Sequence, residues 1–172
     1  NQLLAESTDS HMFATFFYGE LDGPSGRFTC TNAGHDPALL VRHDGMVEWL
    51  SEGGLLLGML PDQEYEQTEV DLAPGDVLVL YTDGITEAGA PLILPGEERP
   101  EPDEEELAAD HGDDDHLLFG EDRLARAVVP ARGRSASGIR EAILAAVQKH
   151  LDGRPQGDDI TLVVIKRTEP PA

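Results

Sequence analysis

The sequence contains little positive charge: its 172 residues include 12 Lys and Arg against 34 Asp and Glu, a net charge of −22. A chain this acidic repels phosphate backbones and anionic lipid surfaces, so we expect neither nucleic acid nor membrane as a partner. Apolar runs are also short. None approaches the roughly 18 residues of a membrane span, and we expect no signal peptide.

Cysteine is almost absent as well. The one cysteine, Cys30, excludes an internal disulfide and is typical of a protein from a reducing cytoplasm. It stands inside the β-forming run RFTCTNA, where a small buried apolar residue is favoured over a nucleophile. We therefore expect a cytoplasmic protein with one domain, 1–172, that is long enough to build an apolar core.

The first half of the chain has the pattern of antiparallel strands. Residues 12–22 predict a buried strand, the turn signal GPSG follows, and residues 27–34 predict the second strand of a hairpin. The dipeptide Asp-Gly separates the apolar runs 37–43 and 46–51, which indicates another hairpin.

Three further strands are predicted. Residues 64–72 alternate in polarity, which indicates a strand with one solvated face. The run VLVLYTDG (77–84) has little alternation and predicts a central strand, and residues 157–167 predict a last buried strand.

Helices are predicted late in the chain, over 119–129 and 135–153. In the second, Ser135 or Ser137 caps the start, and apolar residues recur every four positions along one face. The opening NQLLAEST resembles the last turns of a helix that begins outside the sequence. Strands followed by helices predict an α+β fold with helices packed on a sheet.

Residues 91–118 differ in composition. Eleven carboxylates and one Arg lie between 97 and 116, and large apolar residues are few. Such a composition cannot offset the entropy of ordering, so we predict a long mobile insertion loop. An acidic partner-binding segment and a calcium loop are alternatives, although the spacing of its Asp residues does not match an EF-hand.

Carboxylates stand at the ends of two predicted strands. Asp83 follows one strand, and Asp158 and Asp159 precede another. If the two strands are antiparallel neighbours, these side chains gather at one end of a sheet, where a cation would offset their repulsion. Oxygen ligands suit Mg²⁺ or Mn²⁺. The alternative is that TDG and GDD are ordinary turn sequences.

Six segments in order resemble the PPM-type (PP2C-like) serine phosphatases, in particular the bacterial SpoIIE/RsbU branch. They span nearly the whole chain outside the acidic segment: FATFFYGELD, TNAGHDPALL, GLLLGMLPDQEY, LAPGDVLVLYTDGITEA, FGEDRL and QGDDITLVVIK. The resemblance implies an α-β-β-α sandwich of two antiparallel sheets flanked by helices. It also implies hydrolysis of phosphoserine or phosphothreonine by water that two Mn²⁺ or Mg²⁺ ions activate.

The resemblance also implies roles for individual residues. Asp83 and Asp158 would ligate metal, and Asp159 would either ligate or support the site. Gly84 would let the backbone turn behind the first ligand. In the AGHDP loop, Gly34 and His35 would be supporting residues, with the ring nitrogens of His35 bonded to backbone in preference to a general-acid role.

Two departures from the family are visible. The family's first metal motif, GDxxGxG, would lie upstream of Asn1, so we expect an N-terminally incomplete sandwich. Its open sheet edges would pair with another copy, giving a homodimer, or with a missing segment. We expect this chain alone to bind metal weakly. The second departure is the acidic insertion, which would select substrates by charge.

Three functions compete. The first is a phosphatase acting on a phosphorylated anti-sigma-factor antagonist in a partner-switching pathway, with a sensor domain elsewhere in the parent protein. The second is a non-catalytic regulatory module or an inactive truncated fragment. The third is an acidic calcium-binding domain, which the six ordered segments disfavour. Retention of TDG and GDD favours the enzyme.

Overall fold

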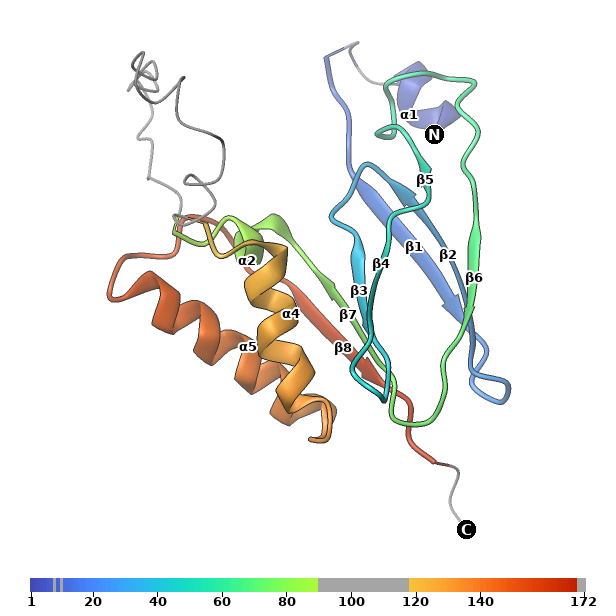
Figure 1. The fold of residues 1–172 in the computed structure, drawn as a ribbon. Helices are drawn as coiled ribbons and strands as arrows, with labels where there is room; N and C mark the ends of the chain where they lie inside the picture. The colour runs from blue at the N-terminus through green and yellow to red at the C-terminus, as the bar shows by residue number, and fades with distance from the viewer. Residues whose placement is uncertain (8, 10, 90–117, 170–172) are drawn as a thin grey trace, which may run out of the picture.

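The computed structural model describes residues 1–7, 9, 11–89 and 118–169, which form two facing β-sheets with helices (Figure 1). The first sheet contains β1 (Phe16–Leu21), β2 (Arg27–Ala33), β5 (Gly53–Gly54) and β6 (Thr68–Asp71). The second has the spatial order β4 (Val47–Leu50), β3 (Ala38–Val41), β7 (Val77–Tyr81) and β8 (Leu162–Lys166). The helices are α1 (Gln2–Ser7), α2 (Asp83–Thr86), α4 (Gly120–Ala131) and α5 (Ala136–Leu151). The predicted α+β sandwich is confirmed.

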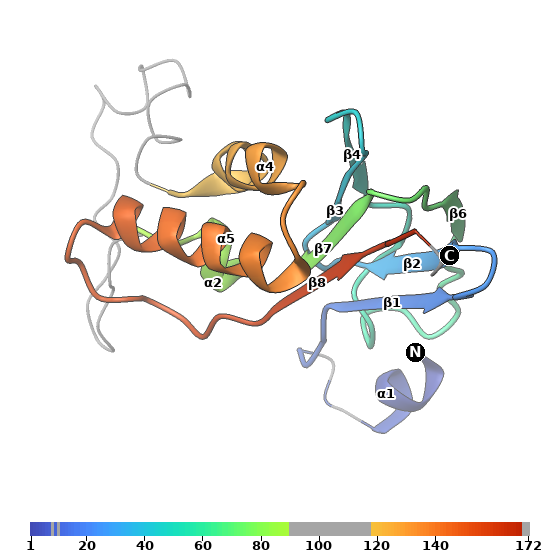
Figure 2. The same cartoon turned by 90° about the horizontal axis from the view of Figure 1, so that it is seen from below.

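Two apolar clusters hold the layers together. One lies between the second sheet and helices α4 and α5, which cover the outer face of that sheet (Figure 2). The other lies between the two sheets and includes Phe28, Cys30 and Leu78. Cys30 is therefore a core residue, as predicted. Burial of these side chains supplies the main favourable free energy of folding.

Helix α5 follows its sequence pattern closely. The Ser135 hydroxyl accepts a hydrogen bond from the Gly138 N–H at 3.2 Å, so the first of the two candidate serines is the cap. One face is buried, and it consists of the predicted stripe of Ile139, Ile143, Val147 and Leu151. Helix α4 is the other predicted helix, and it continues two residues further, to Ala131.

The predicted hairpins are both present. β1 pairs antiparallel with β2, and β3 pairs antiparallel with β4 across a turn in which Gly45 has a φ of 99°. β7 lies between β3 and β8, as expected for a central strand. The alternating segment forms β6, whose polar side chains face solvent.

Two predicted burials are wrong. β1 is shorter than the 12–22 run, and five of its six residues are exposed. β8 is half-buried, and Val163 is 48% exposed. Both strands lie at the edge of their sheet, and each pairs with one neighbour in the described part of the chain. An apolar run predicts that a strand exists but not whether both of its sides are covered.

Helical cover is observed on one sheet. α1 lies beside the loop after β5, where the Asn1 side-chain amide donates to the Leu60 carbonyl at 2.6 Å (Figure 1).

Within the described ranges, no helix is long and apolar enough to cross a membrane. The predicted acidic insertion lies outside the described residues except for Leu118.

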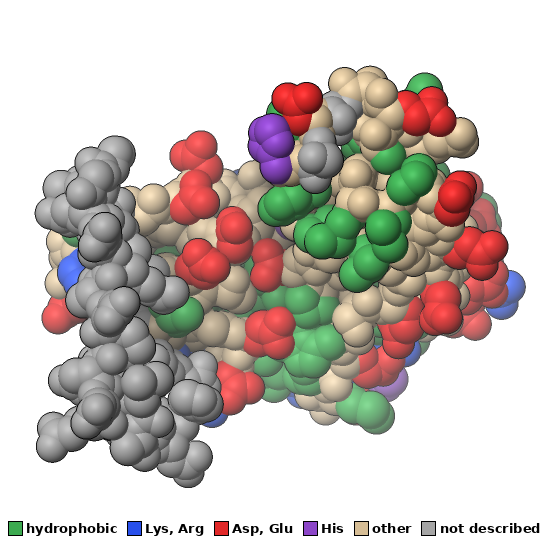
Figure 3. Space-filling view, turned by 90° about the horizontal axis from the view of Figure 1, so that it is seen from above, with side chains coloured by type: hydrophobic (Ala, Val, Ile, Leu, Met, Phe, Trp, Pro, Cys, Tyr) green, Lys and Arg blue, Asp and Glu red, His purple; other side chains and the backbone are tan. Residues whose placement is uncertain are grey.

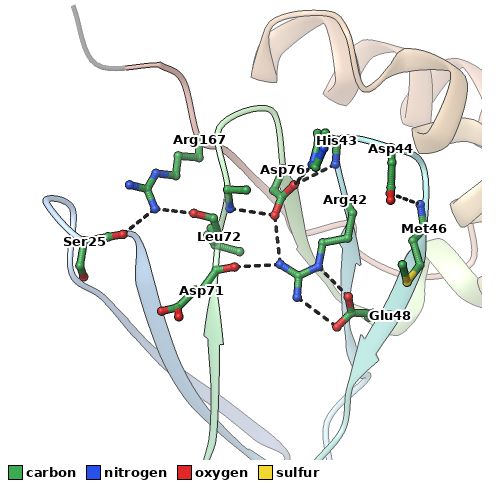
Figure 4. Close-up of polar contacts among 11 residues, drawn as sticks. Ser25, Arg42, His43, Asp44, Met46, Glu48, Asp71, Leu72, Asp76 and Arg167 are labelled. Atoms are coloured by element: carbon green, nitrogen blue, oxygen red, sulfur yellow. Dashed lines mark hydrogen bonds and ion pairs between the residues drawn. The ribbon is translucent and has the colours of Figure 1, made fainter.

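A buried carboxylate fixes the turn before β7. Asp76 is fully buried and accepts hydrogen bonds from the Ala73 and His43 N–H groups at 2.9 and 2.8 Å and from Arg42 Nη1 at 3.0 Å (Figure 4). Burial acts to raise the pKa of Asp76, but these bonds outweigh it and hold the pKa below its ordinary value. Arg42 also donates to the Asp71 carbonyl at 2.8 Å, so the network joins the two sheets.

Candidate metal centre at the ends of β7 and β8

The carboxylates predicted to gather do come from adjoining segments. β7 and β8 pair antiparallel with Tyr81 opposite Leu162, so the end of β7 meets the start of β8. A Cβ atom built on Gly84 would lie 2.4 Å from the Asp159 carbonyl oxygen and 3.2 Å from that of Asp158. Asp83 is therefore brought beside the Asp158–Asp159 pair, and the expected meeting of these strand ends is confirmed.

The close approach of two backbone segments explains why residue 84 is a glycine. Its φ is not in the left-handed region, so a left-handed backbone conformation is not the reason for a glycine here. The residue is glycine because any side chain would collide with the backbone before β8.

Hydrogen bonds fix the two segments against each other. The Thr82 hydroxyl accepts from the Thr161 N–H at 3.0 Å and donates to the Asp159 carbonyl at 3.2 Å. The side-chain amide of Gln156 donates to the Gly84 carbonyl at 2.6 Å. These bonds use backbone groups and neutral side chains, which leaves the carboxylates at the surface.

The carboxylates themselves make only local bonds. Oδ1 of Asp83 accepts from the Gly84 N–H at 2.9 Å, and Oδ1 of Asp158 accepts from the Asp159 N–H at 2.7 Å. All three Asp residues are exposed, and none has an ion-pair partner among the described residues. Their remaining oxygens are thus available to a cation.

The AGHDP loop lies on the same side of the molecule. Gly34 has a φ of 68°, and a Cβ there would lie 2.7 Å from Leu56 Cδ2. The Asn32 side chain accepts from the His35 N–H at 2.7 Å and donates to the His35 carbonyl at 2.8 Å. Asn32, which the sequence did not single out, therefore closes this turn.

The ring of His35 differs from the prediction. Its Nδ1 atom lies 3.1 Å from the Thr15 hydroxyl, so its partner is a side chain and not the backbone. This contact connects the loop to the residue just before β1. The His35 ring also lines a pocket between the sheets, beside Asp36 and Thr82.

Two residues that the sequence did not indicate, Asp36 and Glu121, add negative charge to the site. Burial raises the pKa of Asp36, the charge of His35 lowers it, and Asp83 raises it further. Burial raises the pKa of Glu121, with contributions from Asp36 and Asp122. Asp36 stands in a turn and Glu121 in the first turn of a helix, and acidic residues are common in both places. The sequence alone therefore does not mark either residue as part of a site.

Tyr81 lies among these charges. Burial raises its pKa, and Glu121 and Asp36 raise it further. Its hydroxyl is buried with no hydrogen-bond partner among the described residues. Figure 3 views the molecule from this end and shows Asp and Glu side chains over much of it, with Lys and Arg near the margins. The site therefore concentrates negative charge that a cation would offset.

These residues fit one side of a divalent-cation site. They offer exposed carboxylate oxygens, which Mg²⁺ and Mn²⁺ prefer. The described residues contain no group of three or more His, Cys, Asp or Glu side chains placed to hold a metal ion by themselves. Water or further protein oxygens would have to supply the remaining ligands.

Comparison with known proteins agrees with this geometry. Residues 1–168 match the sequence model of the Stage II sporulation protein E (SpoIIE) family. Protein IcfG of Synechocystis is 28% identical over 165 residues, which are 96% of this chain and 22% of that protein. Phosphoserine phosphatase RsbU of Bacillus subtilis is 35% identical over 88 residues, which are 51% of this chain and 26% of that protein.

The fold is also found in a solved structure. The phosphatase domain of SpoIIE from Bacillus subtilis, presoaked with manganese, superposes with a TM-score of 0.61 at 17% identity, covering 100% of this chain and 64% of that one. This chain spans about a quarter of the length of the curated relatives it matches. With its two sheets, its helices and a family match over nearly its whole length, the chain belongs to the SpoIIE family of PP2C-like phosphatase domains.

Proposed function

We propose that this chain is part of a metal-dependent protein serine/threonine phosphatase that hydrolyses phosphoserine or phosphothreonine. The observation that carries the proposal is the contact between Gly84 and the Asp158–Asp159 backbone, which brings carboxylates from two strand ends together. Such a group of unpaired carboxylates is costly for folding alone, since like charges repel. A role in binding a cation accounts for it.

Each proposed site residue has a distinct task. Asp83 and Asp158 would hold Mn²⁺ or Mg²⁺, and Asp159 would ligate or orient its neighbour. A bound pair of such ions supplies an activated water and neutralises phosphoryl oxygens. Gly84 lets the ligand-bearing segments approach, while His35 and Gly34 shape the adjoining loop.

One relative supports the proposed substrate class. RsbU is named a phosphoserine phosphatase, and its match to this chain covers only 26% of its length. We propose a phosphorylated anti-sigma-factor antagonist as substrate and a sensor domain elsewhere in the parent protein. The acidic surface repels the negative phosphoryl group of a substrate, and bound cations would attract it. The phosphorylated residue is therefore expected to bind at the cations.

A second candidate is a non-catalytic regulatory module. The absence of a three-ligand group among the described residues favours it. The two candidates differ in one respect: the phosphatase hydrolyses a phosphate ester and needs the carboxylates at the site to do so, whereas the regulatory module does not.

The deciding experiment measures manganese-dependent hydrolysis of p-nitrophenyl phosphate by the full-length protein. Loss of groups that merely orient metal ligands costs about 10- to 100-fold, so Asp83→Asn and Asp158→Asn are expected to reduce turnover by at least that factor. Asp62→Asn, which removes the same charge from an exposed loop residue, is the matched control. Turnover that is equal in all three variants and the wild type would exclude the proposed metal centre.

A further inference from the structure

Two tyrosine hydroxyls are buried with no hydrogen-bond partner in the described part of the chain, those of Tyr65 and Tyr81. A buried hydroxyl without a partner has lost its water and gained nothing in return, which costs stability. Tyr81 is the more enclosed of the two residues, since it is 3% exposed and Tyr65 is half-buried. It stands two residues before the proposed ligand Asp83 and is not itself among the proposed ligands.

The two hydroxyls differ in their surroundings. Burial alone raises the pKa of Tyr65. Burial is also the largest cause at Tyr81, but there the charges of Glu121 and Asp36 raise the pKa further. Carboxylates of the metal centre therefore act on the Tyr81 hydroxyl and not on that of Tyr65.

The loop before β3 brings Asp36 to the end of β7. The two strands pair antiparallel, with Leu39 opposite Val79. Continued toward the metal centre, this register places Asp36 beside Thr82, the residue that follows Tyr81. In agreement with this placement, Asp36, Tyr81 and Thr82 line the same pocket.

Asp36 is a better acceptor for this hydroxyl than Glu121. Asp36 is half-buried and has lost part of its water, whereas Glu121 is exposed on the first turn of α4 and stays hydrated. A carboxylate that has lost water gains more from a protein donor.

Asp36 is also the acid that adjoins a proposed ligand. Burial raises its pKa, and the charge of Asp83 raises it further against the opposing effect of His35. Asp36 and Asp83 therefore repel each other, and a cation bound at the site would offset that repulsion.

We propose that Tyr81 is a positioning residue of the metal centre: when a cation is bound, its hydroxyl donates a hydrogen bond to the Asp36 carboxylate and holds it beside Asp83. Asp36 then adds negative charge next to the ligands, and the buried hydroxyl gains a partner. The inference rests on the proposed function and adds Tyr81 and Asp36 to its metal centre.

The manganese affinity of the full-length protein, measured by calorimetry, tests the proposal. Tyr81→Phe removes the hydroxyl alone and is expected to weaken manganese binding about 10- to 100-fold, as for other residues that orient the groups around a metal. Tyr65→Phe removes the other buried hydroxyl and is expected to keep the wild-type affinity.

The stability of the metal-free protein distinguishes positioning from a merely structural role. Neither hydroxyl has a partner there among the described residues, so both variants are expected to unfold at no lower urea concentration than the wild type. A metal-free Tyr81→Phe protein that is clearly less stable than Tyr65→Phe would contradict the proposal.

A second set of variants identifies the acceptor. Asp36→Ala removes the proposed acceptor and keeps the turn, because the Asn32 side chain closes it through the backbone of His35. In the Asp36→Ala background, Tyr81→Phe is expected to cause no further loss of manganese affinity. In the Glu121→Ala background, Tyr81→Phe is expected to cause its full loss. The reverse pattern would assign the hydroxyl to Glu121 and overturn the proposal.

Failure of this inference differs from failure of the proposed function. Wild-type manganese affinity in Tyr81→Phe, together with weakened binding by Asp83→Asn, would overturn the inference and leave the metal centre in place. Absence of manganese binding by the wild-type protein would overturn both.

Discussion

The backbone of Gly84 lies against that of Asp159 so closely that an added Cβ would stand 2.4 Å from the Asp159 carbonyl oxygen. Gly84→Ala must therefore push the segment carrying Asp83 away from the one carrying Asp158. We expect a loss of about 1 to 3 kcal/mol in the free energy of unfolding, as for overpacked core sites. Manganese affinity, measured by calorimetry on the full-length protein, is expected to fall about tenfold or more.

Gly133→Ala is the control for this change. No atom lies within 4 Å of a Cβ built at Gly133, and its φ is not in the left-handed region. This variant is expected to keep its metal affinity. Normal manganese binding by Gly84→Ala would contradict the role assigned to the close approach.

Asp76 is the one buried charged residue in the described part of the chain. Asp76→Asn removes the buried carboxylate that accepts from Arg42, although Arg42 keeps its ion pair with Glu48 at 2.6 Å. Loss of a hydrogen bond to a charged group costs about 1.5 to 3 kcal/mol, and we expect a loss of that size. Urea unfolding measures this loss. Asp71→Asn removes an exposed partner of Arg27 and is expected to cost about 1 kcal/mol or less.

The free energy of unfolding should depend on pH through the ionisation of Asp76. Its folded-state pKa is lowered from 3.8, so its contribution is complete above that value and is lost as the pH falls through the lower folded pKa. The difference in unfolding free energy between wild type and Asp76→Asn is thus expected to be constant above pH 3.8 and to narrow below it. A difference that instead grows with acidification would contradict the proposed hydrogen bonding.

Cys30 is expected to be unreactive in the folded chain. Burial raises its pKa to about 11, with a contribution from Glu52, so the thiolate is scarce at mildly alkaline pH. A thiol-specific disulfide reagent is expected to label Cys30 only after urea unfolds the protein. Rapid labelling of the native chain would show that β2 is not packed as described.

The sequence predicts where the helices and strands of this fold lie better than it predicts which of them are covered by other parts of the chain. The apolar stripe of α5 and the Asp-Gly turn after β3 are local signals, and both were correct. Burial of β1 and β8 depends on what lies beside them, which no local pattern contains. The meeting of Asp83 with Asp158 was predictable because antiparallel neighbours join opposite ends, whereas Asp36 and Glu121 approach only through the packing of a loop and a helix.

The acidic segment between α2 and α4 gives the last prediction. The Phe119 N–H donates to the Ala88 carbonyl at 2.9 Å, so the chain leaves and returns beside α2, near Asp83. Replacing residues 95–115 with a neutral linker of equal length removes eleven carboxylates from the sequence between these two points. In low salt, the full-length variant is expected to hydrolyse an acidic phosphopeptide faster relative to a neutral one, and the gain should shrink as salt screens the charges. Unchanged preference at low salt would exclude charge selection by this segment.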